Sequence, residues 1–280
     1  MSVINTNLAS LNAQRNLSTS SASLNTSIQR LSSGLRVNSA KDDAAGLSIA
    51  TKMDSQIRGM NQAIRNANDG ISMAQTADGG LATAIDALQR MRELAVQGAN
   101  QTMKDGGTEA DRKNLSKEFE QLQAELGRIA SDTKFNGRAI LGGDKDTFDI
   151  QVGADSGSAV IQIPETDLAG AVAGDVDAAT IKVDTSANSL LAVAAIDTAL
   201  DAINTMRADL GAAQNRLGFA VSNLQSASEN QSAAKSRIMD TDFAAETAKL
   251  TRGQILQQAG TAMLAQANSA PNGVMALLRG

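Results

Sequence analysis

The sequence of 280 residues predicts a mainly α-helical protein: an elongated antiparallel helical bundle or coiled coil with paired terminal helices and a small β-hairpin tip region. Three observations support this prediction. Apolar residues recur at steps of three and four over most of the chain, which is the spacing of a helix seam. The period changes to two near residue 148, which is typical of strands. Both ends carry thin apolar stripes that need a partner helix.

The two stripes are poor in charge and rich in small polar residues. They consist of Ile4, Leu8, Leu11, Leu17, Leu24, Ile28, Leu31 and Leu35 at the N-terminus, and of Met239, Phe243, Leu250, Leu256, Met263, Leu277 and Leu278 at the C-terminus. Hydroxyl and amide groups can hydrogen bond where a buried charge would be costly. We therefore expect an inner coiled coil whose helices pair with each other and with neighbouring copies. A disordered polar tail is the alternative interpretation.

The four-three spacing is clearest between the stripes and the middle of the chain. It runs from Ile49 to Ala74 and resumes at Leu81, and we expect the helix to continue through Gly79 and Gly80. The predicted order is a helix over residues 49–98, a loop at 101–110, a second helix at 111–130 and a turn at 135–137. Two antiparallel helices joined by a loop follow from this order.

Short β-branched runs then replace the helical pattern. Strands or hairpins are predicted at residues 147–152, 160–163 and 180–183, separated by Gly, Asp and Ser. From residue 189 to 235 helical spacing returns, with an unbroken four-three alternation from Ile196 to Leu224. A helix of that length would span about 70 Å and needs lateral partners. We expect the preceding helices to be those partners, with the β region forming a tip.

Composition excludes several kinds of active site. The chain has no His and no Cys, so the usual general acid or base at neutral pH, the thiolate nucleophile and the common zinc ligands are absent. Nothing groups the carboxylate, Lys or Ser residues in a Gly-rich or nucleophile-elbow context. With no Trp or Tyr, few side chains remain for an aromatic ligand cage. We predict a protein that is not an enzyme and needs no cofactor or metal.

Charge is distributed unevenly along the chain. The net charge is −5, yet residues 1–40 carry +3, while residues 141–200 carry −8. The acidic middle is expected to face solvent, and no clustered basic face supports nucleic acid as a partner. We find no secretory signal pattern and expect no membrane insertion. Export would then require a dedicated route. The absence of Cys suits a chain that crosses redox compartments, because it has neither disulfides nor free thiols.

Three sequence runs closely resemble hallmark runs of bacterial flagellin. They are LSSGLRVNSAKDDAAGL at residues 31–47, QRMRELAVQ at 89–97 and QQAGTAMLAQAN at 257–268. The resemblance covers roughly residues 1–140 and 190–280. It implies a structural subunit of the flagellar filament, secreted to the outside of the cell, in a compact form with a minimal outer domain. It also implies an inner domain of residues 1–44 and 241–280, and a rod of residues 45–240 with its β-rich tip at about 141–188.

The resemblance further implies partners. Many copies would form a helical tube that acts as the motility propeller, joined by cap and junction proteins. Export would proceed unfolded through the flagellar type III apparatus, with a chaperone on the C-terminal helix. The host Toll-like receptor for flagellin would recognise the monomer at Gln89, Arg90 and Leu94, with Glu118 as the matching acid. From the residues alone, Leu94 reads as rod core and Arg90 as part of a solvated helix face.

Two other functions remain open at this point. A hook-filament junction protein shares helical ends and the same tube geometry, although the match of all three runs favours the filament subunit. A soluble coiled-coil adaptor would also show long four-three seams. The copy number per filament separates the first alternative from the filament subunit, and polymerisation at high concentration separates the second.

Overall fold

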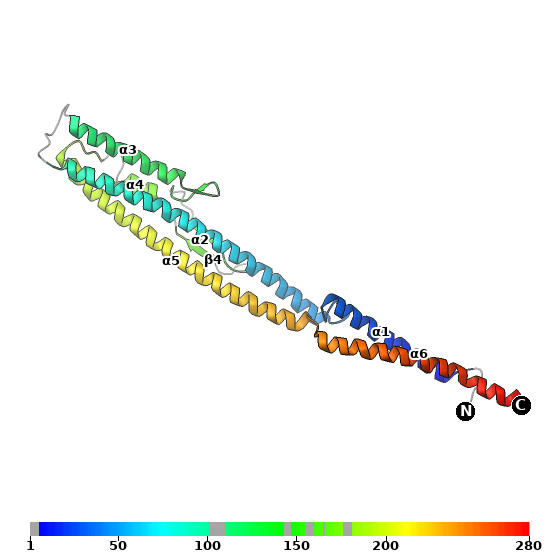
Figure 1. The fold of residues 1–280 in the computed structure, drawn as a ribbon. Coiled ribbons are helices and arrows are strands. Elements are labelled where there is room, and N and C mark those ends of the chain that lie inside the picture. The colour runs from blue at the N-terminus through cyan, green and yellow to red at the C-terminus, as the bar shows by residue number, and fades with distance from the viewer. Residues whose placement is uncertain are drawn as a thin grey trace. The chain divides into compact units, whose positions relative to one another are not determined.

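A computed structural model describes residues 6–100, 110–142, 147–154, 160–164, 166–175 and 181–279. The chain divides into two compact units. The terminal unit contains Met1–Ser55 and Glu229–Gly280, and the rod unit contains Gln56–Ser228. The described residues form mainly helices, with two small antiparallel hairpins. The predicted mainly α fold with paired terminal helices is therefore confirmed (Figure 1).

The terminal unit is built around helices α1 (Leu8–Ser33) and α6 (Phe243–Arg279), which lie side by side and antiparallel (Figure 1). The side chain of Asn7 begins α1 by accepting a hydrogen bond from the Ser10 N–H at 3.0 Å. Gly34 ends the helix with φ 70°, a left-handed conformation in which a Cβ would be strained. The Gly34 carbonyl then accepts a bond from the Thr241 N–H at 2.9 Å, which ties the two ends of the chain together.

The rod unit is built around α2 (Ala44–Gly98) and α5 (Ser186–Met239), which run antiparallel, with α3 (Ala110–Asp132) against α2 (Figure 1). The predicted seam of α5 is confirmed, although the helix is longer than expected, with 54 residues. Its fully buried large residues are seven apart: Ile196, Ile203, Leu210 and Leu217. Ion pairs between α2 and α5 join Arg92 to Asp197 at 2.7 Å and Asp78 to Arg207 at 2.6 Å.

Helix α5 is long and apolar enough to span a membrane by length and composition, with a window of mean hydropathy 1.3. The large apolar residues of its seam already pack in the core of the rod unit, beside Leu81, Leu88 and Met91 of α2. A core helix of a water-facing bundle meets the same criterion. We therefore interpret α5 as the core helix of the rod.

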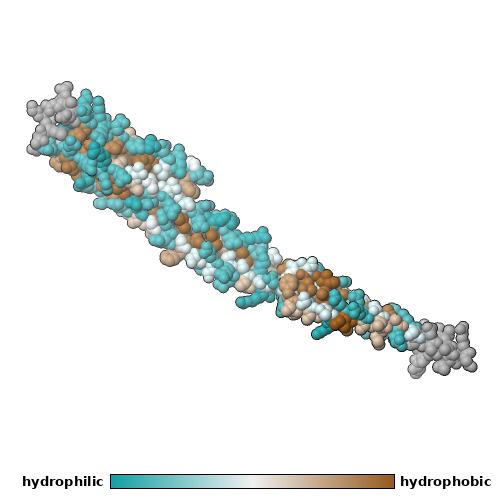
Figure 2. Space-filling model, in the orientation of Figure 1, coloured by the Kyte–Doolittle hydropathy of each residue, from teal (hydrophilic) through white to brown (hydrophobic). Residues whose placement is uncertain are grey.

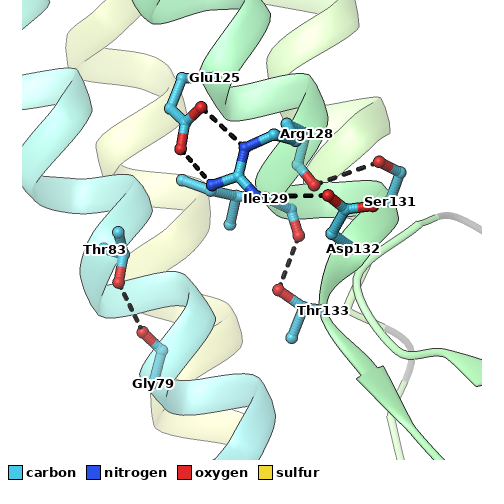
Figure 3. Close-up of polar contacts among 8 residues, drawn as sticks. All are labelled: Gly79, Thr83, Glu125, Arg128, Ile129, Ser131, Asp132 and Thr133. Atoms are coloured by element: carbon cyan, nitrogen blue, oxygen red, sulfur yellow. Dashed lines mark hydrogen bonds and ion pairs between the residues drawn. The ribbon is translucent and has the colours of Figure 1, made fainter.

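Helix α2 continues through its two adjacent glycines, as predicted. The Thr83 hydroxyl donates a hydrogen bond to the Gly79 carbonyl at 3.1 Å within the helix (Figure 3). Gly80 has a packing role, because a Cβ at this position would lie 2.7 Å from Leu141 and 3.0 Å from Thr133. The segment that follows α3 can approach α2 closely only because residue 80 has no side chain.

The end of α3 leads into a tight hairpin. The hydroxyls of Ser131 and Thr133 donate to the carbonyls of Arg128 and Ile129 (Figure 3). The Ile129 carbonyl also accepts from the Thr133 N–H at 3.1 Å, so the last turn of the helix is closed by both groups of Thr133. Strands β1 (Lys134–Phe135) and β2 (Arg138–Ala139) then pair across Asn136 and Gly137, which both have positive φ. Two residues with positive φ are what a type I′ hairpin turn requires. The predicted turn at 135–137 is confirmed.

The second hairpin also agrees with the sequence. Strand β3 (Phe148–Gln151) pairs antiparallel with β4 (Val160–Ile163), with Phe148 opposite Ile163. The Arg138 guanidinium lies 4.5 Å from the centre of the Phe148 ring, so a cation–π contact links the two hairpins.

Two features of the tip differ from the sequence prediction. The described part of the run at 180–183 is not a strand: Val183 packs against Gly98, and the Ile181 carbonyl accepts a side-chain bond from Gln123. Helix α4 (Leu168–Asp175) was not predicted. The feature of the sequence that indicates this helix is Asp167. Its carboxylate caps the N-terminus of α4 by accepting a hydrogen bond from the Gly170 N–H at 2.6 Å. The predicted loop at 101–110 lies outside the described residues except for Ala110, which begins α3.

Candidate functional sites

The interface between α1 and α6 consists of leucines packed on glycines. A Cβ at Gly260 would lie 3.1 Å from a methyl carbon of Leu17, and a Cβ at Gly253 would lie 3.2 Å from a methyl carbon of Leu24. Both pairs are seven residues apart on each helix, so they form successive layers of one antiparallel coiled coil. The absence of a side chain on α6 lets the backbone of α1 come close. Helix pairing in the terminal unit therefore depends on these two glycines.

Polar groups close both ends of this interface. The Ser27 hydroxyl donates to the Glu246 carboxylate at 2.7 Å, and Glu246 is only 4% exposed. At the other end, the Ser10 hydroxyl donates to the Asn268 side-chain oxygen at 2.8 Å, and the Asn7 amide donates to the Ala267 carbonyl at 2.7 Å. These bonds fix the register of the pair, since a slip would leave buried polar groups without partners.

Glu246 is the buried charge of the terminal unit. The hydrogen bond from Ser27 lowers the pKa of its carboxyl group, and the ammonium of Lys249 at 3.0 Å acts in the same direction. A lowered pKa means that ionised Glu246 stabilises the folded unit above the ordinary glutamate pKa of about 4.3. This stabilisation is lost as the pH falls through the lowered pKa.

We predict that Glu246→Gln destabilises the terminal unit at pH 7 by about 1 kcal/mol, because a charged hydrogen bond is replaced by a neutral one. The difference from the unsubstituted chain should shrink as the pH falls through the lowered pKa of Glu246, since Glu246 itself then becomes protonated. Thermal unfolding followed by circular dichroism at pH 7 and at a series of lower pH values measures this. Glu229→Gln changes an exposed carboxylate and is the matched control. A loss of stability that stays constant over the whole acidic series would contradict the assignment.

The structure leaves many of the predicted assembly residues exposed. Leu8, Leu11, Ile28, Phe243, Leu256 and Met263 are exposed, while Leu24, Leu31, Leu35 and Leu250 are half-buried. Ile4 lies outside the described residues, as do the side chains of Leu277 and Leu278. Figure 2 shows hydrophobic residues at the surface over α1 and α6. An exposed apolar surface of this kind marks a site of association.

The predicted receptor face lies where α2 and α3 run side by side. The Arg90 guanidinium binds the Glu118 carboxylate at 2.8 Å and the Glu93 carboxylate at 2.9 Å. Hydrogen bonds to Glu118, and then to Glu93, raise the pKa of Arg90. Arg90, Glu118 and the adjacent Gln89 are all exposed, so this part of the face is open to a partner.

Leu94, which the resemblance implies as a receptor contact, is buried, in agreement with its interpretation from the residues alone as rod core. Leu94 is 1% exposed and belongs to the core of the rod unit. The exposed apolar residue of the run is Val96. Leu94 therefore supports the shape of this face from within.

Sequence reasoning missed the residues that hold the terminal pair together: Ser27, Glu246, Gly253 and Gly260. The sequence signal of a helix seam is a row of large apolar residues, whereas the inner row of α6 is made of a carboxylate and small residues. Their signal is a seven-residue spacing, since Glu246, Gly253, Gly260 and Ala267 form one heptad row.

Comparison with known proteins agrees with this arrangement of helices. Residues 4–146 match the bacterial flagellin N-terminal helical region, and residues 193–278 match the bacterial flagellin C-terminal helical region. The chain belongs to the bacterial flagellin family. The resemblance noted in the three sequence runs is thereby confirmed.

Individual flagellins match over the whole chain. A flagellin of Halalkalibacterium halodurans is 47% identical over 278 residues, which are 99% of this chain and 100% of the relative. Flagellin A of Vibrio cholerae is 36% identical over an alignment of 379 residues that covers 99% of each chain. The crystal structure of Bacillus cereus flagellin aligns with a TM-score of 0.50 and 31% identity, covering 61% of this chain and 94% of that chain.

Membership of the flagellin family decides the broad function. Flagellins are structural proteins, and this one is a subunit of the homopolymeric, extracellular flagellar filament. With 280 residues, it has a minimal outer domain. The exposed terminal helices are consistent with a protein whose partner is another copy of itself.

Proposed function

We propose that this flagellin polymerises into a helical tube that acts as the motility propeller, with residues 1–44 and 241–280 as the inner domain. The observation that carries this proposal is the paired α1 and α6, whose outer sides expose large apolar residues. If one side of a subunit binds a different side of the next and the rotation does not close a ring, a helical polymer results. Residues 45–240 would then form the rod, with the tip at about 141–188 facing solvent.

The experiment that tests this function is polymerisation of the purified chain at high concentration, imaged by negative-stain electron microscopy. We expect tubes that contain this chain along their whole length. A hook-filament junction protein would instead occur in few copies at one end of a filament, and a soluble adaptor would remain unpolymerised. Either result would overturn the proposal.

We also propose export of the unfolded chain through the flagellar type III apparatus, with a chaperone on α6 and with cap and junction proteins at the filament. The exposed apolar residues of α6 support a chaperone contact, because they would need cover before assembly. Finding the protein outside cells that lack this apparatus but retain general secretion would contradict the export route.

We further propose that the host Toll-like receptor for flagellin recognises the monomer at the face around Arg90. The support is an exposed cluster of Gln89, Arg90 and Glu118 across two packed helices, a rigid arrangement of polar groups. Arginine is frequent among the residues that dominate binding energy at interfaces. Leu94 would act indirectly, by packing α2 against α3.

We predict that Arg90→Ala combined with Glu118→Ala lowers receptor activation by the monomer about tenfold or more. Leu94→Ala is a poor test, because a cavity in the core would destabilise the rod. The matched control is Arg128→Ala, which removes an exposed, ion-paired arginine from the end of α3. Dose-response curves in receptor-expressing cells measure the effect. Equal potency of the double variant and the control would exclude this face.

A further inference from the structure

We propose that helices α1 and α6 of the monomer bind a single-chain anionic amphiphile, a fatty acid, in a groove along one side of the pair. Two connected hollows form this groove, a larger one of about 590 Å³ and a smaller one of about 330 Å³. Asn16, Ser20 and Leu256 line both hollows, so the groove is continuous. The larger hollow is mainly apolar, and the smaller hollow is polar and basic. This division matches the acyl chain and the carboxylate of a fatty acid.

The larger hollow offers an apolar lining for the acyl chain. Its large apolar side chains are those of Leu17 on α1 and of Leu256 and Met263 on α6. Leu256 and Met263 are 51% and 64% exposed, so a chain bound here would remove apolar surface from water. Small residues make up most of the remaining lining: Ala9, Ala13, Ala259 and Gly260.

The smaller hollow supplies the groups that bind a carboxylate. Lys249 and Arg252 line it from α6, and the hydroxyl-bearing Thr19, Ser20 and Ser23 line it from α1. No acidic residue is among the described residues that line either hollow. Lys249 already binds the Glu246 carboxylate at 3.0 Å, whereas Arg252 has no ion pair within the described part of the chain. Arg252 is therefore the cation open to the ligand, and a guanidinium can bind a carboxylate through two parallel hydrogen bonds.

The wider charge of the helix pair favours an anion over a cation. Helices α1 and α6 together contain five basic residues and one acidic residue, Glu246, although the whole chain has a net charge of −5. Glu246 is 4% exposed and is bound by Ser27 and Lys249, so it offers no site to a cationic headgroup. A positive surface beside an apolar groove attracts amphiphiles with a negative headgroup.

An unpaired hydroxyl lies where the two hollows meet. Among the described residues, the Ser20 hydroxyl oxygen is buried and has no hydrogen-bond partner. A buried hydroxyl without a partner costs free energy that an acceptor would recover. Rotation about χ1 moves a serine hydroxyl between staggered positions, so Ser20 can turn toward a carboxylate in the groove. The carboxylate is thereby placed near Ser20 and Arg252, with the acyl chain directed toward Met263.

The length of the groove sets the length of the chain that fits. Arg252 and Met263 are eleven residues apart on α6, which corresponds to about 16 Å along the helix. The extended chain of dodecanoate is comparable in length. Dodecanoate is therefore the probe with which the site is tested.

Isothermal titration calorimetry of the full-length monomer tests the site. Dodecanoate is used below its micelle concentration, and the protein below the concentration at which filaments form. We expect one dodecanoate per chain. Dodecyltrimethylammonium has the same alkyl chain with a positive headgroup, and it should bind about tenfold more weakly. Equal affinity for the two amphiphiles, or many dodecanoate molecules per chain, would show non-specific adsorption and overturn the proposal.

Substitution of Arg252 tests the charged end of the groove. Arg252→Gln should weaken dodecanoate binding about fivefold, which is the effect of losing one exposed ion pair. Arg252→Lys keeps the charge and should retain most of the affinity. The matched control is Arg237→Gln, because Arg237 is an exposed arginine at the end of α5 that lines neither hollow. Equal losses of affinity for Arg252→Gln and Arg237→Gln would contradict a specific carboxylate site.

Substitution of Met263 tests the apolar end independently. Met263→Gln should weaken binding about tenfold, because part of the acyl chain loses its apolar contact. Ile255→Gln is the control, since Ile255 is 59% exposed on α6 and lines neither hollow. Equal losses for these two variants would overturn the groove, as would binding to anionic vesicles without binding of dodecanoate. None of these measurements depends on filament formation, so their failure leaves the proposed polymerisation intact.

Discussion

Deleting residues 1–40 and 241–280 together is expected to abolish filament formation completely and to leave a soluble helical monomer. The deletion removes α1 and α6. Seven of the thirteen exposed large hydrophobic residues among the described positions lie on these two helices: Leu8, Leu11, Ile28, Phe243, Ile255, Leu256 and Met263. The rod unit keeps its own core, in which Leu88 of α2, Phe119 of α3 and Ile203 of α5 are fully buried. Loss of assembly should therefore occur without loss of folding.

Circular dichroism measures whether the fragment is helical, and analytical ultracentrifugation measures whether it is a monomer. Both are done at concentrations at which the full chain polymerises. The control is the full chain under the same conditions. Long filaments grown from the shortened chain alone would show that the rod unit carries the assembly contacts. An unfolded fragment would show instead that the rod needs the terminal helices for its own stability.

The second large effect is expected from Gly253→Leu combined with Gly260→Leu. At both positions even a single Cβ would be in tight contact with a leucine of α1, so a whole leucine side chain cannot be accommodated without separating the helices. Overpacking costs about 1–3 kcal/mol at each site. We expect α1 to detach from α6, and filaments to be absent in negative-stain images of the purified variant.

Gly127→Leu on α3 is the matched control, because nothing lies within 4 Å of a Cβ at that position. This control should polymerise normally and gain up to about 0.8 kcal/mol of helix propensity. Hydrogen exchange then locates the defect: faster exchange in α1 and α6, with unchanged exchange in α2 and α5, is expected for the double variant. Normal filaments from the double variant would mean that the terminal pair is not part of the tube in this form.

The long helices could be predicted because their seams are periodic over many turns. The alternation from Ile196 to Leu224 predicted α5, and the continuity of α2 through Gly79 and Gly80 followed from apolar residues on both sides. Local turn chemistry predicted the hairpin at Asn136 and Gly137. These signals are contained in short stretches of chain, so they need no knowledge of the tertiary fold.

The features that escaped prediction depend on contacts between distant segments. The packing role of Gly253 and Gly260 in α6 becomes apparent only when α1 is placed against them. The role of Glu246 also depends on a distant segment. A carboxylate in the first turn of a helix usually indicates an interaction with the helix dipole, whereas Glu246 accepts a hydrogen bond from Ser27 of α1.

The two ion pairs between α2 and α5 have opposite polarity, and together they fix the register in which the two helices pack. At Asp78 the acid lies on α2, whereas at Arg92 the base does. A slip of α5 by one heptad would keep the apolar seam but would place Leu200 or Gln214 opposite Asp78, and Leu190 or Asn204 opposite Arg92. Every copy of the chain is thus held to one register. Identical spacing between the contact surfaces of successive subunits is what a polymer of many copies requires to remain uniform.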